Sequence, residues 1–235
     1  MTAAASSPRI VSIQVGLPQE CGTEGAADEH DTPWRTGFYK LPVAGPVQAK
    51  SLGIVGDGVA DRVHHGGIDK AVLAYSADHY PVWNRDLRGS GLLATEEMTG
   101  GAFGENLSIT GLGENDVCIG DLWQAGDVLL EVSQPRQPCW KLSRRWRIAD
   151  LAAQVIRNGK SGWYVRVVRE GTLTAGLELT LIARKHPTWT IARVNDVGYH
   201  QKKEIALATE LAALPELAAA WREMFEDRVR KHRER

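Results

Sequence analysis

The sequence contains few of the residues that would assign it to several common classes of protein. Among its 235 residues there are three cysteines, at wide spacings and without a CxxC pair. An odd number of dispersed cysteines argues against a disulfide framework, and three thiols are too few for an ordinary iron–sulfur cluster. We therefore expect free thiols in a reducing compartment.

Long apolar runs and an excess of positive charge are also absent. No segment reaches the roughly 18 consecutive apolar residues of a membrane helix, and the start, MTAAASSPRI, has no secretory signal pattern. The formal net charge is -1, whereas general binding to nucleic acid or to a membrane surface requires a basic excess. We predict a cytoplasmic protein that binds neither, with a disordered start over residues 1–8.

Short segments with strand character dominate the first three quarters of the chain. Alternating or β-branched residues, bounded by Gly, Asp or Pro, mark them. The segments are 9–17, 127–134, 162–171 and 177–185. The Gly-bounded turn GTLTAG joins the last two and predicts a hairpin that pairs residues 163–170 with 177–184. Two helices are expected between the strands, over 76–88 and 148–160.

After residue 185 the pattern changes to helix formers. Three further helices are expected, over 190–200, 203–214 and 215–235. The last has Pro215 near its start, Glu216 in its first turn and a basic end, which matches the helix dipole. Many short strands with Gly-rich turns predict an α+β fold, with a β-barrel-like domain over residues 1–185 and a small three-helix domain over 186–235.

One cysteine stands in an unusual setting. In SQPRQPCWKL, residues 133–142, Cys139 lies between a proline and a tryptophan. The segment 136–147 holds five cations and no acid: Arg136, Lys141, Arg144, Arg145 and Arg147. Cationic neighbours favour the thiolate, which attacks electrophiles and binds soft metals. The alternative is a buried cysteine at the end of a strand, the interpretation that we favour for Cys118. Cys21 lies in a loop and is either an exposed thiol or part of the mouth of a site.

Two glycine-containing stretches could line a binding site. In DRVHHGGIDKAV, residues 61–72, glycines permit close approach of a ligand, and Lys70 is a natural contact for an anion. A turn with surface histidines explains His64 but not the whole set. In GAFGENLSITGL, residues 101–112, Asn106 offers both donors and acceptors, although a generic loop is the alternative. Asp57 and Asp61 could supply carboxylates, with a solvated loop as the default. The usual close-spaced pair of zinc ligands is absent from the sequence, which argues against a zinc site.

Taken together, four stretches resemble the MOSC family (molybdenum cofactor sulfurase C-terminal domain), in its YiiM-like branch with an added helical domain. They are GDGVADRVHHGGIDKAVLAY, GAFGENLSITGL, IGDLWQAG and VSQPRQPCWKL, in that order. The resemblance covers about residues 36 to 232. It implies a β-barrel-like α+β fold that binds the molybdenum cofactor (molybdopterin), a pterin dithiolene with a phosphate tail.

The resemblance also implies roles for individual residues. Cys139 falls on the molybdenum ligand, and it and His65 are the expected catalytic residues. The residues expected to bind the cofactor are Lys70, Asn106, Arg136, Gly66, Gly67, Gly104 and Arg166. Arg166 is included because it shares a strand face with Tyr164 by parity. His64 departs from the family pattern.

The family resemblance further implies reduction of a small N-hydroxylated substrate, such as a hydroxylamino-purine or an amidoxime. Because the sequence has no recognisable flavin, haem or iron–sulfur motif, a separate flavoprotein or other redox partner must supply the electrons. One alternative is a non-enzymatic cofactor carrier or sulfur-transfer module that uses Cys139. Another is an interaction module that works through its helical tail. The intact PRQPC segment argues against this second alternative. The oligomeric state is open, a homodimer included.

Overall fold

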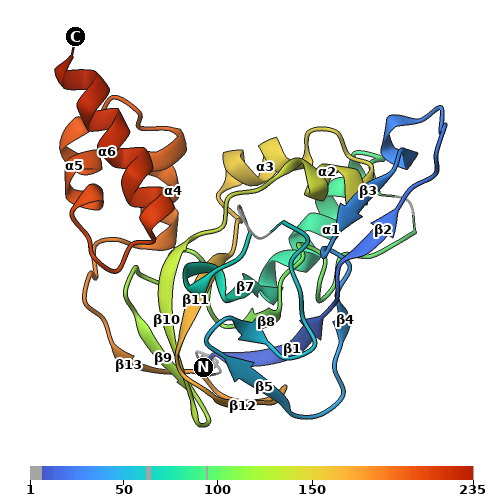
Figure 1. Ribbon diagram of the computed structural model, residues 1–235, viewed down its shortest axis with the longest axis horizontal. Coiled ribbons are helices and arrows are strands. Elements are labelled where there is room, and N and C mark those ends of the chain that lie inside the picture. Colours follow the sequence, from blue (N-terminus) through green and yellow to red (C-terminus); the bar gives the residue numbers. More distant parts are fainter. Residues whose placement is uncertain (1–6, 62–64, 94, 235) are drawn as a thin grey trace, which may run out of the picture.

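The computed structural model describes residues 7–61, 65–93 and 95–234, and its main feature is a curled eight-stranded sheet (Figure 1). The strand order is β13-β9-β10-β11-β7-β8-β1-β4, with β7 and β8 parallel and the other neighbours antiparallel. These strands are β1 (Arg9–Val15), β4 (Leu41–Pro42), β7 (Val72–Ser76), β8 (Leu107–Thr110), β9 (Leu122–Ala125), β10 (Val128–Pro135), β11 (Trp163–Arg169) and β13 (Thr180–Ala183). The expected α+β, barrel-like fold is confirmed.

Backbone hydrogen bonds connect the two ends of the sheet. The amide of Ile10 in β1 donates to the carbonyl of Leu177 at 3.0 Å, and the amide of Leu179 donates to the carbonyl of Pro8 at 2.8 Å. Since residues 177–179 lead directly into β13, these bonds bring the β13 edge of the sheet against β1. Pro8 is therefore held in place, while residues 1–6 of the expected disordered start lie outside the described residues.

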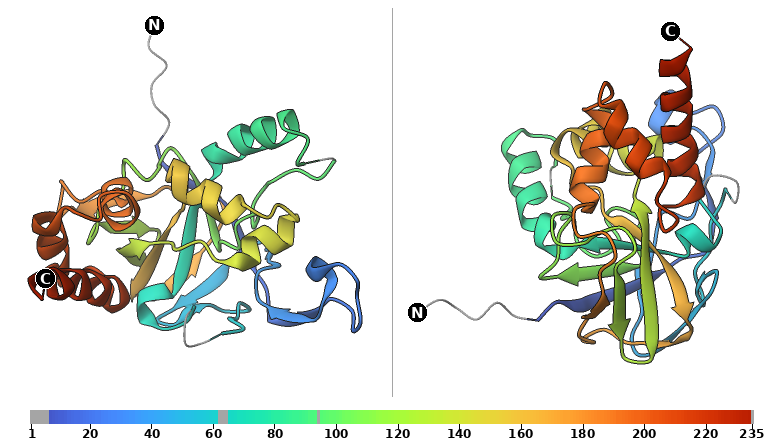
Figure 2. Two further views of the ribbon diagram at one scale, coloured as in Figure 1. Left: turned by 90° about the horizontal axis from the view of Figure 1, so that it is seen from above. Right: turned by 90° about the vertical axis from the view of Figure 1, so that its left-hand side faces the viewer.

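Two small sheets flank the large one. β12 (Gly171–Leu173), β5 (Val47–Lys50) and β6 (Gly53–Ile54) form one, and β2 (Gln19–Cys21) and β3 (Trp34–Thr36) form the other. The β2–β3 hairpin and the C-terminal helices lie at opposite ends of the molecule (Figures 1 and 2). The short 3₁₀ helices are η1 (Glu29–Asp31), η2 (Ile68–Lys70) and η3 (Ala77–His79).

Six α-helices complete the described part of the chain. They are α1 (Tyr80–Gly89), α2 (Trp140–Trp146), α3 (Leu151–Asn158), α4 (Ile191–Tyr199), α5 (Ile205–Ala212) and α6 (Ala219–Arg233). The helices expected over 76–88 and 148–160 are present, as α1, which begins at Tyr80 and ends at Gly89, and as the shorter α3. The sequence did not predict α2, because a seven-residue helix that ends at Trp146 shows too little periodicity.

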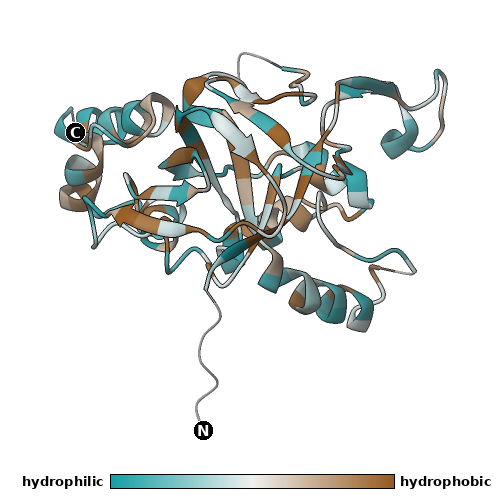
Figure 3. Cartoon of the chain, turned by 90° about the horizontal axis from the view of Figure 1, so that it is seen from below, coloured by the Kyte–Doolittle hydropathy of each residue, from teal (hydrophilic) through white to brown (hydrophobic). Residues whose placement is uncertain are grey.

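The apolar core has two parts. The larger joins inward residues of the sheet, such as Ile10 and Val132, to residues of α4–α6, such as Val194 and Trp221. The smaller, rich in aromatic rings, lies under α1–α3 and includes Tyr75 and Phe103. Apolar residues gather along the central strands, and polar residues cover the outer faces of the helices (Figure 3). The C-terminal helices therefore share one apolar core with the sheet.

The expected hairpin between 163–170 and 177–184 is wrong. Both edges of β11 are already paired, with β10 and with β7, so β13 pairs with β9 instead. The connecting residues form β12, which pairs with β5. Local turn chemistry suggested a hairpin, but the curl of the large sheet determines the pairing.

The start expected for the last helix is also wrong. α6 begins at Ala219, so Pro215 and Glu216 precede it rather than form its first turn. The amide of Ala218 donates to the carbonyl of Ser133 in β10 at 2.9 Å, which ties the preceding turn to the sheet. This tertiary bond sets the helix start where local propensity alone would place it earlier.

Candidate functional site

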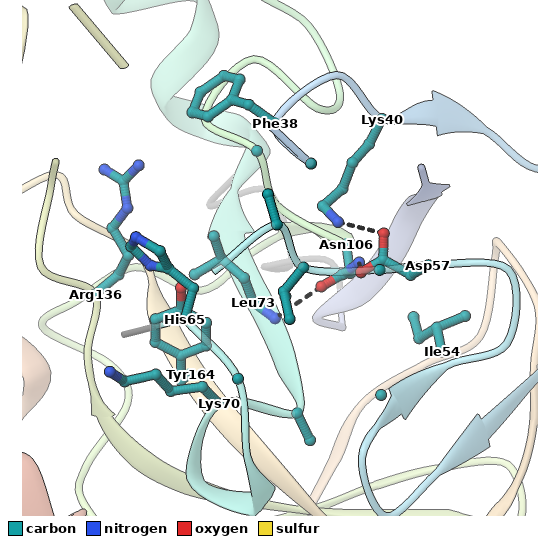
Figure 4. Close-up of a pocket in the computed structure, with 18 of the residues that line it drawn as sticks. Phe38, Lys40, Ile54, Asp57, His65, Lys70, Leu73, Asn106, Arg136 and Tyr164 are labelled. Atoms are coloured by element: carbon teal, nitrogen blue, oxygen red, sulfur yellow. Dashed lines mark hydrogen bonds and ion pairs between the residues drawn. The ribbon is translucent and has the colours of Figure 1, made fainter. Parts of the chain in front are cut away.

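A cavity of about 620 Å³ lies at one side of the large sheet (Figure 4). Five segments far apart in sequence line it together with Tyr164: parts of 36–40, 50–60, 65–73, 103–106 and 136–141. Eight of the nine residues singled out in the sequence are among them: His65, Gly66, Gly67, Lys70, Gly104, Asn106, Arg136 and Cys139. The fold thus brings together residues that the sequence holds up to about seventy positions apart.

Cys139 lies on the cavity wall at the start of α2. It is half-buried, in an extended conformation, and its carbonyl accepts a hydrogen bond from Leu142 at 3.1 Å. β10 ends at Pro135, so the segment 136–138 carries the chain from the sheet to this position. The thiol is open to a cavity, unlike that of a cysteine packed in the core.

Arg136 is buried in the wall with part of its hydrogen-bonding capacity unused. The residue is 4% exposed, and its Nη2 donates to the carbonyl of Phe103 at 3.3 Å. Within the described part of the chain, its buried Nη1 has no hydrogen-bond partner. A buried, charged donor without a partner is costly, and a ligand oxygen is the kind of group that would satisfy it.

His65 and Lys70 add to the same wall (Figure 4). Burial lowers the pKa of His65, and the positive charges of Lys141, Lys70 and Arg136 lower it further, against Asp61. Burial also lowers the pKa of Lys70, against the attraction of Asp69 and Asp61. We call His65, Lys70, Arg136 and Lys141 the cationic wall; it repels additional positive charge and favours an anionic ligand.

Across the cavity, Lys40, Asp57 and Asn106 form a hydrogen-bonded network (Figure 4). Asp57 pairs with Lys40 Nζ and accepts hydrogen bonds from Asn106 Nδ2 at 2.8 Å and from the Gly16 amide at 2.9 Å. Asn106 Oδ1 accepts from the Leu73 amide at 3.1 Å. Burial lowers the pKa of Lys40, although Asp57 opposes this. We call these three residues the paired wall, because its positive charge has a carboxylate partner.

Comparison with protein families agrees with this geometry. A model of the MOSC domain matches residues 61–180, and a model of the YiiM-like 3-alpha helix domain matches residues 189–232. The chain belongs to the MOSC domain family. It is a YiiM-like member, because the second match covers α4–α6.

Individual relatives cover between 76% and 92% of the chain. The Bacillus subtilis protein YflK is 35% identical over 92% of both chains, and Escherichia coli YiiM is 33% identical over 80% of this chain and 82% of its own. A Gibberella moniliformis protein named "Reductase" is 37% identical over 76% of this chain but only 31% of its own length. The crystal structure of YiiM from Geobacillus stearothermophilus superposes with a TM-score of 0.76 at 36% identity, covering 94% of this chain and 99% of that one.

Three of the five cations near Cys139 in the MOSC sequence have partners away from the cavity. Arg144 donates to the carbonyl of His30 at 3.1 Å and contacts Thr32, Arg145 pairs with Glu96, and Arg147 pairs with Asp28 at 3.0 Å. These partners come from other segments, so the absence of acids within 136–147 did not mean unpaired charge. Of the five, Arg136 and Lys141 line the cavity.

Arg166 does not line the cavity. Tyr164 does, and the two residues share a strand face as parity predicts. Two residues further along β11, however, that face meets Asp69, Glu131 and the turn before α6. Arg166 Nε donates to Asp69 at 2.7 Å, and its Nη1 donates to Glu131 and to the carbonyl of Glu216, each at 2.9 Å.

Sequence reasoning missed Lys40 and left Asp57 as a solvated loop residue. The available signal was a lysine among apolar and aromatic residues in GFYKLPV, which favours a buried cation with a partner. Cys118 is 1% exposed, as expected for a core residue, and half-buried Cys21 ends β2 and does not line the cavity. His64 lies outside the described residues.

Two searches of the described residues bear on other kinds of site. No cluster of three or more His, Cys, Asp or Glu side chains with the arrangement of a metal site occurs among them. None of the helices in that part of the chain has the length and apolar character to cross a membrane.

Proposed function

We propose that this MOSC protein binds the molybdenum cofactor in the cavity and reduces N-hydroxylated compounds, with Cys139 as a molybdenum ligand. The observation that carries the proposal is that a half-buried thiol and an orphaned, buried guanidinium nitrogen both lie in the lining of one cavity. Family membership and a relative named as a reductase support it. That name belongs to a longer protein, of which this chain matches a third or less.

The residues present fit such a cofactor. A thiolate is a suitable ligand for a soft metal site. The Arg136 guanidinium presents a planar set of donors that suits phosphate oxygens, and the unused Nη1 is available for one. The cavity volume of about 620 Å³ lies within the roughly 300–1,000 Å³ of typical cofactor and ligand sites.

The chain's own side chains would then divide the work. Bound cofactor would supply the two-electron redox chemistry, which side chains cannot provide. Cys139 would hold the metal through its sulfur, and Arg136 and Lys70 would bind anionic oxygens. Asn106 would act indirectly, because its side chain is already hydrogen-bonded to Asp57 and Leu73.

His65 is suited to moving protons. Reduction of an N-hydroxyl group to an amine consumes two electrons and two protons and releases water. Because burial and neighbouring cations lower its pKa, His65 is neutral near pH 7 and can accept a proton at a ring nitrogen. Once protonated among other cations, it returns that proton readily to the departing oxygen. The electrons would come from a separate protein, for which a flavoprotein is the first candidate.

Metal analysis tests the proposal. Wild type, Cys139→Ser and Cys21→Ser are produced in a host that makes the cofactor, and molybdenum per chain is measured. We expect wild type and Cys21→Ser to carry comparable molybdenum and Cys139→Ser to have lost it. Cys21→Ser is the matched control, because it makes the same substitution outside the cavity.

Turnover is measured next, with a hydroxylaminopurine and a flavoprotein electron donor. Wild type is expected to produce the amine and Cys139→Ser to be inactive. Full molybdenum and full activity in Cys139→Ser would disprove the ligand assignment. A wild type that binds no molybdenum while Cys139 accepts sulfane sulfur would favour the sulfur-transfer alternative.

A further inference from the structure

Asp69 anchors the cavity segment 65–70 to the rest of the fold, on the side that faces away from the cavity. This residue lies in η2, directly before Lys70, and its side chain points away from the cavity lining. Its Oδ1 accepts from Arg166 Nε at 2.7 Å, and its Oδ2 accepts from the amide of Ala219, the first residue of α6, at 3.3 Å. Its carbonyl accepts from the Ser133 hydroxyl at 2.6 Å. One residue therefore connects the cavity segment to β10, β11 and the C-terminal helices.

Arg166 is the centre of this connection. Its guanidinium donates to Asp69, to Glu131 of β10 and to the carbonyl of Glu216, just before α6. Its side chain is 18% exposed, so solvent screens these interactions only in part. Because the planar guanidinium contacts three separate segments at once, it fixes their relative positions.

α4 packs against β10, the strand that leads into segment 136–141 of the cavity wall. Burial raises the pKa of the Tyr199 hydroxyl, and the neighbouring Arg136 and Gln137 side chains lower it. Gln137 lines the cavity and follows Arg136 in the chain. The C-terminal helices thus contact segment 65–70 and pack against β10, which leads into segment 136–141.

We infer that the C-terminal helices support the binding site from outside its lining, and that Asp69 and Arg166 are positioning residues that hold segment 65–70 in the cavity wall. The inference concerns the charge of the cavity, whichever ligand it takes, and so does not depend on the proposed function. If the helices only covered the core, loss of Arg166 would lower stability and leave the cavity unchanged.

Alkylation of Cys139 measures the cavity charge directly. The rate of reaction is compared for iodoacetate, an anion, and iodoacetamide, its neutral analogue, by peptide mass spectrometry at low salt. Both reagents consume the thiolate, so the ratio of the two rates cancels its ionisation and reports only the attraction of the cavity for an anion. A Cys21→Ser background removes the other half-buried thiol.

We expect Arg166→Met to lower the iodoacetate-to-iodoacetamide ratio by about threefold, since the charge of Lys70 is no longer held in the wall. Asp69→Asn, which keeps the size of the side chain, is also expected to lower the ratio. Loss of the carboxylate charge near Lys70 would by itself raise the ratio, so a fall reports displacement of the segment. The matched control is Arg184→Met: Arg184 also forms an ion pair, with Asp121 at 2.7 Å, but neither residue lines the cavity. Its ratio is expected to stay at the wild-type value.

The inference is overturned if Asp69→Asn and any folded Arg166→Met protein keep the wild-type ratio. It is also overturned if Arg184→Met lowers the ratio equally, because the effect would then follow general loosening. Circular dichroism and thermal unfolding of each variant separate a change in the cavity from loss of the fold. Should Arg166→Met fail to fold, the near-isosteric Asp69→Asn decides the question alone.

Discussion

The two walls of the cavity use positive charge in opposite ways. On the paired wall, Lys40 is bound to Asp57, and Asp57 is held in turn by Asn106 and by a backbone amide. On the cationic wall, the buried Nη1 of Arg136 has no hydrogen-bond partner among the described residues. The difference indicates that the paired wall satisfies its own charges, whereas Arg136 on the cationic wall retains a buried donor that a ligand oxygen would satisfy.

The largest effect is expected from breaking the paired wall. Asp57→Asn leaves Lys40 buried without its carboxylate, which should lower the free energy of unfolding by about 3–5 kcal/mol. Denaturant unfolding measures this loss. The double variant Lys40→Met/Asp57→Asn removes both charges and should recover much of it. A single-variant loss below about 1 kcal/mol would show that the pair is not buried as described.

Removing the buried charge of the cationic wall should have the opposite effect on stability. Arg136→Met removes a buried charge whose Nη1 is unsatisfied, so stability should stay the same or rise by about 1–2 kcal/mol. The preference of Cys139 for iodoacetate over iodoacetamide should fall by about fivefold, because the most buried cation of this wall is gone. Destabilisation comparable to that of Asp57→Asn would contradict the contrast between the walls.

A pH titration should distinguish His65 from the other residues of its wall. Its pKa is lowered in the folded protein, so just below the unfolded value of 6.5 the unfolded chain binds more protons. Stability therefore rises with pH through this window, and acidification destabilises the fold. His65→Gln should flatten the stability profile just below pH 6.5. A profile as steep as that of wild type would mean that His65 is solvated.

The smallest effect is expected for Lys141. It lines the cavity but is only partly buried, so solvent screens its charge. Lys141→Met should change the alkylation ratio of Cys139 by less than about twofold, and added salt should remove most of that change. An effect larger than that of Arg136→Met would reverse the assigned ranking within the cationic wall.

The sequence predicted the cavity better than the topology around it. Local chemistry singled out the thiol of Cys139 and the glycine turn beside His65, and the resemblance to the MOSC family added Asn106, whose own stretch reads equally well as a generic loop. The hairpin at 163–184 failed, because strand pairing depends on which sheet edges are already occupied. That information is not local in the sequence.

The ion-pair partners of charged residues also could not be predicted from the local sequence. Arg166 was placed on the correct strand face, but the position along that face at which Asp69 and Glu131 meet it depends on the whole sheet. Lys40 was missed for the same reason, since its partner Asp57 is 17 residues away. A cation in a sequence reveals its role only when the fold shows whether a carboxylate faces it.

The sulfur of Cys139 is the centre of the account, and X-ray absorption at the molybdenum edge tests it most directly. Wild-type protein loaded with cofactor should show a sulfur contribution that is smaller in Cys139→Ser, or Cys139→Ser should retain no molybdenum at all. Full molybdenum with an unchanged sulfur contribution in Cys139→Ser would contradict the account.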